Sequence, residues 1–138
     1  MPLSAVTGFS SFPYTFSSAD TYLIEVNVSN PLGSQTVNVT ILVQYPIQSI
    51  SFKAAFNFTH PYLAQGQQVD FVAGVAQGSD PLFQWTVLTP TTQHTVSGSA
   101  LQLNFTEIGQ YSITVGVSNA VSQESRGFTV YVLSLIHI

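Results

Sequence analysis

The 138-residue sequence contains no cysteine. This absence excludes disulfide frameworks, thiolate zinc sites and cysteine nucleophiles. Charge is also scarce, because only 6% of the residues are charged and the formal net charge is −4. The two basic residues, Lys53 and Arg126, are isolated in the sequence. A basic surface for nucleic acid or for an anionic membrane is therefore not expected.

Long apolar runs are missing too. The longest are far shorter than the roughly 20 residues needed to cross a bilayer, so membrane insertion of this segment is not expected. The segment after Met1 has neither a basic region nor a sustained apolar stretch, and it is not expected to act as a signal peptide. If the protein is secreted, its signal is expected to lie outside this sequence.

The residue types that favour helices are few. Lys, Glu and Arg are scarce, whereas aromatic, β-branched and hydroxyl residues are abundant. This composition favours strands over helices. An all-β fold is therefore predicted.

One segment occurs twice in the sequence. Residues 22–30 (YLIEVNVSN) recur as residues 111–119 (YSITVGVSN), an offset of 111 − 22 = 89 residues. Self-similarity at a fixed period is typical of arrays of like modules. Alignment of positions 16–43 with positions 105–132 at this offset keeps nine identities, namely Phe16, Tyr22, Ile24, Val26, Val28, Ser29, Asn30, Thr40 and Val43.

The two copies differ in the length of sequence ahead of them. Residues 46–99 precede the second copy, whereas the first copy has only a short segment before it. Residues 1–45 are therefore interpreted as the C-terminal part of one module, contributing three strands, and residues 46–132 as a complete module. A module of this length can bury a core unaided.

Strands are predicted from alternation of apolar and polar residues. Short strands joined by frequent turns, with no helical pattern, indicate a two-sheet antiparallel sandwich. The expected strand segments of the complete module are 51–58, 69–73, 83–87, 94–96, 101–105, 111–117 and 128–132.

Three features favour an immunoglobulin-like sandwich. Trp85 lies on the third strand, where such sandwiches bury a tryptophan, and Tyr111 begins the sixth strand as a tyrosine corner does. Two residues later Ile113 stands where antibody domains have a cysteine, so its packing against the strand of Val69 and Phe71 is expected to replace the disulfide. Tyr22 and Ile24 repeat this arrangement in the partial copy.

These residues give the chain a resemblance to a known family. The strand Gly-x-Tyr-x-Ile-x-Val-x-Val-Ser-Asn at positions 109–119, Trp85, and the phrases at positions 29–34 and 118–122 resemble tandem polycystic kidney disease (PKD) repeats over about residues 14–133. The chain departs from the family at Trp85-Thr-Val-Leu-Thr-Pro90, where the family has Trp-Asp-Phe-Gly-Asp-Gly. The paired aspartates are absent, and nothing about that acidic turn is carried over.

The resemblance implies a non-enzymatic extracellular module within a large membrane receptor, in a plasma-membrane or ciliary location. Such arrays are linked to cell–cell or cell–matrix contact and to mechanical sensing. The implied partners are neighbouring PKD modules and protein or carbohydrate ligands on the cell surface or matrix. The alternative is an accessory polysaccharide-binding module of a secreted hydrolase; a sugar-binding face usually carries several exposed aromatic residues, and here Tyr131 is the clearest outward one.

Glycosylation is predicted from an excess of N-x-[S/T] sequons. Four of the six asparagines, Asn27, Asn38, Asn57 and Asn104, lie in such sequons, which are the acceptors of N-linked glycans in secreted proteins. Each is placed on the solvent side by strand parity, because its apolar neighbours are expected to face inward. The alternative is that they are ordinary polar residues on sheet faces.

The two remaining asparagines, Asn30 and Asn119, follow long strands directly. We expect turn residues that bond their own backbone; the functional alternative is a ligand contact.

The histidines His60 and His94 are separated, with no carboxylate at metal spacing. No catalytic elbow, phosphate-binding loop or zinc motif occurs, so neither a cofactor nor an enzymatic activity is expected.

The last six residues, LSLIHI at positions 133–138, read as the translation of a transposon end used in sequencing-library preparation. A non-native tail is therefore expected. The alternative is a native linker that begins the next module.

Overall fold

The computed structural model describes residues 11 and 13–134, and this part of the chain contains ten strands and no helix. The prediction of an all-β fold is confirmed. Contacts divide the chain into two compact units, residues 1–45 (unit 1) and residues 46–138 (unit 2). Within the described residues, no helix has the length and apolar character of a membrane span.

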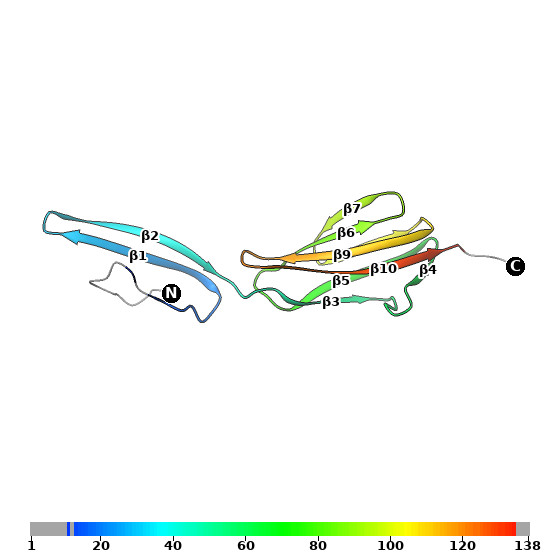
Figure 1. The fold of residues 1–138 in the computed structure, drawn as a ribbon, viewed down its shortest axis with the longest axis horizontal. Coiled ribbons are helices and arrows are strands. Elements are labelled where there is room, and N and C mark those ends of the chain that lie inside the picture. Colours follow the sequence, from blue (N-terminus) through cyan, green and yellow to red (C-terminus); the bar gives the residue numbers. More distant parts are fainter. Residues whose placement is uncertain (1–10, 12, 135–138) are drawn as a thin grey trace. The chain divides into compact units, whose positions relative to one another are not determined.

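Unit 1 contains an antiparallel hairpin of β1 (Asp20–Asn30) and β2 (Gly33–Val43) (Figure 1). The prediction of three strands in residues 1–45 is wrong for the described residues 11 and 13–45, which hold two. Phe16 aligns with Phe105, the last residue of a strand in unit 2, but these residues of unit 1 include no neighbouring strand to pair with it.

Unit 2 is a sandwich of two sheets (Figure 1). One sheet has three antiparallel strands in the order β3 (Gln48–Ala54), β5 (Gln67–Gln77) and β8 (Ala100–Phe105). The other has five strands in the order β4 (Tyr62–Ala64), β10 (Gln123–Leu133), β9 (Gly109–Ser118), β6 (Leu82–Leu88) and β7 (Gln93–Ser97). All pairings are antiparallel except that of β4 with β10, which is parallel.

The core lies between the two sheets, because each strand turns alternate side chains inward. Trp85 on β6 and Ile113 on β9 are completely buried and share one apolar cluster with Val69 and Phe71 of β5. Among the described residues, no polar or charged residue is fully buried. The sandwich is thus closed by apolar packing, with Ile113 at the position where antibody domains have a cysteine.

The first strand of unit 2 ends earlier than the alternation predicted. β3 stops at Ala54, and Phe56 and Phe58 lie in the following loop. Phe56 is half-buried and packs against the core, whereas Phe58 is 38% exposed and lies at the margin of the core, 5.0 Å from Phe128 and 6.0 Å from Phe52, centroid to centroid. The alternation therefore predicted that these two rings contact apolar neighbours, but it placed the end of the strand too late. The three-residue β4 was not predicted at all.

The chain enters and leaves unit 2 at opposite ends of the sandwich (Figure 1). Near the start, the backbone N–H of Ile47 donates to Ser122 Oγ in the turn that begins β10. At the other end, the N–H of Gln65 donates to the carbonyl of Leu133. β10 has 11 residues and so spans about 35 Å between these ends. It includes Leu133, the first residue of the expected tail, while residues 135–138 lie outside the described part.

Gly78 lies close to Ile47, at the end of the sandwich where the chain enters unit 2. It has φ of +144°, and a Cβ added there would lie 2.5 Å from Ile47 Cδ1 and 3.1 Å from Ile47 Cα. Gly98 has φ of +110° but open space around it. We expect Gly78→Ala to lower the free energy of unfolding more than Gly98→Ala does, by about 1–3 kcal/mol, because only the first variant overpacks a buried contact.

The measurement is urea denaturation followed by the fluorescence of Trp85, the only tryptophan. Equal losses in the two variants would show that backbone strain alone acts at these glycines and would contradict the steric account.

Candidate functional site

The ionisable residues of the structure are dispersed. Among the described residues, no group of three His, Asp or Glu side chains could hold a metal ion. His94 Nε2 lies 3.0 Å from Thr92 Oγ1, and His60 donates its backbone N–H to the carbonyl of Asn57. Asp70 points outward from β5, and Asp80 has φ of +46° in the loop before Pro81. This arrangement does not assemble an acid–base pair.

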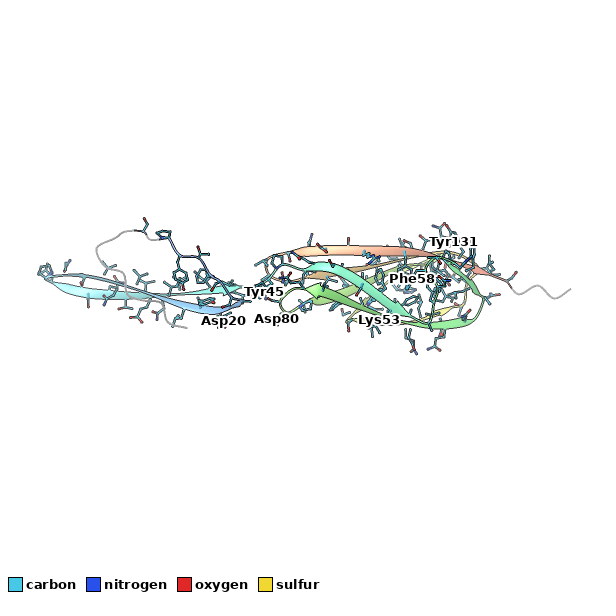
Figure 2. All side chains as sticks on the ribbon, turned by 90° about the horizontal axis from the view of Figure 1, so that it is seen from below. Asp20, Tyr45, Lys53, Phe58, Asp80 and Tyr131 are labelled. Atoms are coloured by element: carbon cyan, nitrogen blue, oxygen red, sulfur yellow. The ribbon has the colours of Figure 1, made fainter. Side chains whose placement is uncertain are left out.

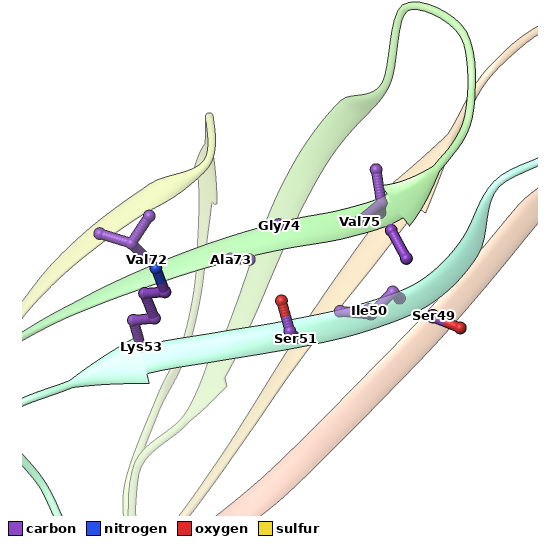
Figure 3. A pocket seen from close by; sticks show the side chains of 9 residues that line it. Ser49, Ile50, Ser51, Lys53, Val72, Ala73, Gly74 and Val75 are labelled. Carbon is purple, nitrogen blue, oxygen red and sulfur yellow. The ribbon is translucent and has the colours of Figure 1, made fainter.

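A shallow groove crosses the outer face of the three-stranded sheet (Figure 3). Its volume is about 450 Å³. Lys53 and Val72 lie at one end, and Gly74 lies beside Ser51 along its floor. One cation, apolar side chains and serine hydroxyls do not form a convergent set of polar groups, which a small-molecule site requires. The lining residues are Ser49, Ile50, Ser51, Lys53, Val72, Ala73, Gly74, Val75 and Ala76.

All four sequon asparagines are exposed. Asn27 and Asn38 lie on β1 and β2, and Asn104 lies on β8 opposite Gln68. The sequence pattern placed Asn57 on a strand, but in the structure it lies in the loop after β3. Its Oδ1 accepts hydrogen bonds from the backbone N–H and the hydroxyl of Thr59, at 3.0 and 2.6 Å.

Asn119 closes the turn between β9 and β10. Its Oδ1 accepts from the N–H groups of Val121 and Ser122 and from the Ser122 hydroxyl, at 3.0–3.1 Å. Its Nδ2 donates to the carbonyl of Ser79, 40 residues away, at 3.0 Å. Because Ser122 also accepts from the N–H of Ile47, this asparagine joins the turn, the loop before β6 and the first residues of unit 2.

Asn30 closes the equivalent turn in unit 1. Its Oδ1 accepts from the N–H groups of Leu32 and Gly33, at 2.8 and 3.1 Å. Among the described residues, nothing accepts a hydrogen bond from its Nδ2. The local turn is thus the same in both copies, whereas the long-range bond occurs in unit 2.

The hydroxyl of the tyrosine near the start of each long strand forms a hydrogen bond with the backbone of the residue four positions earlier. In unit 2 the Tyr111 hydroxyl accepts from the N–H of Glu107 at 3.0 Å. In unit 1 the Tyr22 hydroxyl donates to the carbonyl of Ser18 at 2.9 Å. Each tyrosine also packs on a preceding phenylalanine: Phe105–Tyr111 centroids are 4.9 Å apart and Phe16–Tyr22 centroids are 4.6 Å apart. Tyr22 is buried, and Ile24 beside it is half-buried.

The outer face of the five-stranded sheet carries an aromatic pair. Tyr62 on β4 lies in register with Tyr131 on β10, and their rings stack with centroids 5.6 Å apart. Tyr62 is 57% exposed and Tyr131 is 38% exposed. Figure 2 shows Tyr131 at one margin of unit 2 and Lys53 at the other. Tyr62 was missed in the sequence because its strand is too short to show alternation.

Arg126 is a second residue whose role has no sequence signature. Its guanidinium donates from Nη1 to the carbonyl of Ile50 at 2.7 Å and lies 5.3 Å from the centre of the Phe52 ring. Because Arg126 is on β10 and both partners are on β3, the side chain connects the two sheets. A cation over an aromatic face adds a favourable electrostatic contact.

The PKD domain family model matches residues 52–132. Human polycystin-1 is 29% identical over 115 residues, which cover 83% of this chain and 3% of polycystin-1. The chain therefore spans a small fraction of the length of that relative. The match does not by itself assign the activity of the whole receptor to the chain.

Two solved structures share the fold. The PKD domain of the human VPS10 domain-containing receptor SorCS2 superposes with a TM-score of 0.52 and 12% identity, covering 97% of this chain and 98% of that one. The amphioxus IgVJ-C2 molecule superposes with a TM-score of 0.50 and 14% identity, covering 82% of this chain and 60% of that one. At these identities the likeness shows the immunoglobulin-like fold alone, and it confirms the predicted sandwich.

The long-range bond of Asn119 can be tested by substitution. Asn119→Asp keeps an acceptor for the turn but replaces the donor that the Ser79 carbonyl uses, so we expect the free energy of unfolding to fall by about 1–3 kcal/mol. Asn119→Ala also removes the turn acceptor and is expected to cost more. Denaturant unfolding at neutral pH measures both; wild-type stability of Asn119→Asp would contradict the assigned role of Nδ2.

Proposed function

This chain belongs to the PKD domain family, and we propose that it serves as a non-enzymatic extracellular module of a polycystin-1-like membrane receptor. In this proposal it acts in cell–cell or cell–matrix adhesion, in ligand presentation or as a mechanical spacer, at the plasma membrane or the cilium. Its partners are neighbouring PKD modules and protein or carbohydrate ligands on the cell surface or matrix. The similarity to polycystin-1 and the generally non-catalytic nature of PKD domains support this choice.

The observation that carries the spacer role is the parallel pairing of β4 with β10. The chain enters unit 2 at one end and leaves from β10 at the other. Tension between these ends pulls β4 and β10 in opposite directions along their length. Hydrogen bonds between parallel strands then share the load in shear, and they must break together before the sandwich opens. Two of these bonds join the N–H of Tyr131 to the carbonyl of Pro61 and the N–H of Gln65 to the carbonyl of Leu133.

Exposed sequons support the extracellular location. Asn27, Asn38, Asn57 and Asn104 all present their side chains to solvent. Glycans at these sites would cover a surface with few charges to keep it soluble. The sequons on unit 2 lie in the loop after β3 and on β8, which leaves the outer face of the five-stranded sheet without a glycan site.

One observation favours the second candidate function, a polysaccharide-binding module. Tyr62 and Tyr131 give the outer face of the five-stranded sheet two exposed aromatic rings where the sequence indicated one. The rings stack on each other, so each offers one face to a sugar. A row of coplanar rings, which a polysaccharide platform needs, is not formed by this pair.

The spacer role predicts a specific mechanical effect of Tyr131→Pro. Proline removes the N–H that donates to the Pro61 carbonyl, and this loss is worth about 1 kcal/mol at equilibrium. We expect a clear fall in the unfolding force of unit 2 when a polyprotein of tandem units is stretched by atomic force microscopy. Tyr131→Ala keeps the N–H while removing the exposed ring, and its unfolding force should match the wild type.

Binding of the unmodified chain to a glycan array completes this experiment. Extension of unit 2 at negligible force, together with tight binding of one polysaccharide that Tyr131→Ala abolishes, would overturn the spacer role and establish the carbohydrate-binding one.

Glycosylation is a separate expectation. Expression through a eukaryotic secretory route should place glycans on at least two of the four sequon asparagines, which mass spectrometry after enzymatic deglycosylation detects as Asn-to-Asp mass shifts. Asn30 and Asn119, which lie outside sequons, serve as internal controls. Secreted protein with no modified asparagine would count against the extracellular assignment.

A further inference from the structure

The loop between β3 and β4 holds one sequon in a defined turn. Residues 57–60 form this turn, in which the N–H of His60 donates to the carbonyl of Asn57 at 3.0 Å. Asn57 Oδ1 accepts from the N–H and the hydroxyl of Thr59, as an asparagine at the first position of a β-turn does. None of the other three sequon asparagines of the described chain has a hydrogen-bonded side chain.

The turn occupies the oxygen of the Asn57 amide and leaves its nitrogen available. No described residue accepts a hydrogen bond from Nδ2, and the side chain is exposed. An N-linked glycan attaches to this nitrogen, whereas the carbonyl oxygen keeps its acceptor sites. Both bonds from Thr59 are therefore compatible with the modified asparagine, and they hold its amide in one orientation.

Phe58 follows Asn57 directly and is incompletely covered by the core. Its ring centroid lies 5.0 Å from those of Phe56 and Phe128 and 6.0 Å from that of Phe52. These contacts hold the ring in place, yet 38% of the residue is exposed. A fixed, exposed aromatic ring offers a preformed apolar surface on which the C–H groups of a sugar can pack.

The other three sequons have no exposed aromatic ring beside them. They lie on strands, where the side chains of adjacent residues point to the opposite face of the sheet. Their cross-strand partners are not aromatic either: Asn27 pairs with Thr36, Asn38 with Glu25, and Asn104 with Gln68. A glycan on Asn57 therefore differs from the others in having such a ring next to its first sugar.

We infer that Asn57 carries an N-linked glycan and that its first N-acetylglucosamine packs against the exposed part of the Phe58 ring. The sugar comes from a lipid-linked diphosphate donor: the bond from Nδ2 to C1 of the sugar forms, the bond from C1 to the diphosphate oxygen breaks, and Nδ2 releases one proton. The packed sugar covers the margin of the core where Phe52 of β3 meets Phe128 of β10. This inference rests on the proposed extracellular function, because the secretory route supplies the donor.

A separate protein is a poorer occupant of this site. The exposed surface is that of a single ring in a turn, whereas a stable protein interface buries about 800 Å² on each partner. A sugar on the adjacent residue does not need such an area, because a covalent bond already holds it beside the ring.

The test uses the full chain with Asn57 as its one sequon, which the substitutions Asn27→Gln, Asn38→Gln and Asn104→Gln produce. The protein is secreted from a eukaryotic host that makes high-mannose glycans, and an endoglycosidase trims each glycan to one N-acetylglucosamine. We expect NMR to show nuclear Overhauser effects between this sugar and the Phe58 ring, together with upfield ring-current shifts of the sugar protons.

A chain whose one sequon is Asn104 is the matched control, and its sugar should show neither signal. In the Asn57 chain, Phe58→Leu should remove the ring-current shifts and leave glycosylation of Asn57 intact, as mass spectrometry verifies. The single sugar on Asn57 should also raise the midpoint of thermal unfolding by at least about 2 °C, relative to the same chain made without glycans in bacteria. Fluorescence of Trp85 follows this transition, and Phe58→Leu should abolish the rise.

The remaining outcomes would overturn the inference. Glycans on the other sequons of the unsubstituted chain, with none on Asn57, would do so and leave the extracellular location standing. A modified Asn57 whose sugar has the same chemical shifts as the sugar on Asn104 would exclude the contact with Phe58. A rise in the midpoint that survives Phe58→Leu would place the stabilising contact elsewhere. Absence of glycans from all four sites of the secreted chain would overturn both the inference and the proposed extracellular location.

Discussion

Apolar burial between two sheets is the interaction on which unit 2 depends. The sequence has no cysteine, and no polar or charged residue among those described is fully buried, so neither a disulfide nor a network of buried polar residues closes the sandwich. Trp85, Ile113 and Phe71 fill the space between the sheets from strands of both. Burial of each such side chain contributes about 1.5–3 kcal/mol, which is a large fraction of the 5–15 kcal/mol typical of a whole domain. The contacts at the edges, from Arg126 and Asn119, position the sheets around this core.

The repeated strand separates the effect of sequence from the effect of surroundings. In both β1 and β9 the first tyrosine bonds the backbone four residues earlier, the apolar positions match, and an asparagine closes the following turn; both strands form long antiparallel hairpins with the strand that follows. Local signals are therefore sufficient for the hairpin. They are not sufficient for burial, because Val115 is covered by the opposite sheet and Val26 is not. A two-stranded hairpin is at best marginally stable in water without a packed face, so the two copies are expected to differ in stability although they agree in geometry.

Local patterns in the sequence predicted the parts of unit 2 that depend on near neighbours. Alternation located β6, β8 and β9, and the burial of Trp85 and Ile113 was predicted from their positions in an immunoglobulin-like sandwich. The alternation failed where a side chain packs against the core from irregular backbone, as Phe56 does, and where a strand is too short to alternate, as β4 is. The Tyr62–Tyr131 pair and the Asn119–Ser79 bond could not be predicted, because each joins residues that are distant in sequence and meet only through the topology.

The central claim is that the covering sheet, rather than the strand sequence, stabilises the repeated strand. Amide hydrogen exchange of the unmodified 138-residue chain, read residue by residue, tests it most directly by comparing equivalent positions in β1 and β9. The account predicts that the amides of Ile113 and Val115 exchange only through global unfolding of unit 2, whereas those of Ile24 and Val26 exchange at least about 100-fold faster through local opening. Equal protection at the equivalent positions would contradict it, because the strand sequence and its hairpin partner would then be sufficient without a covering sheet.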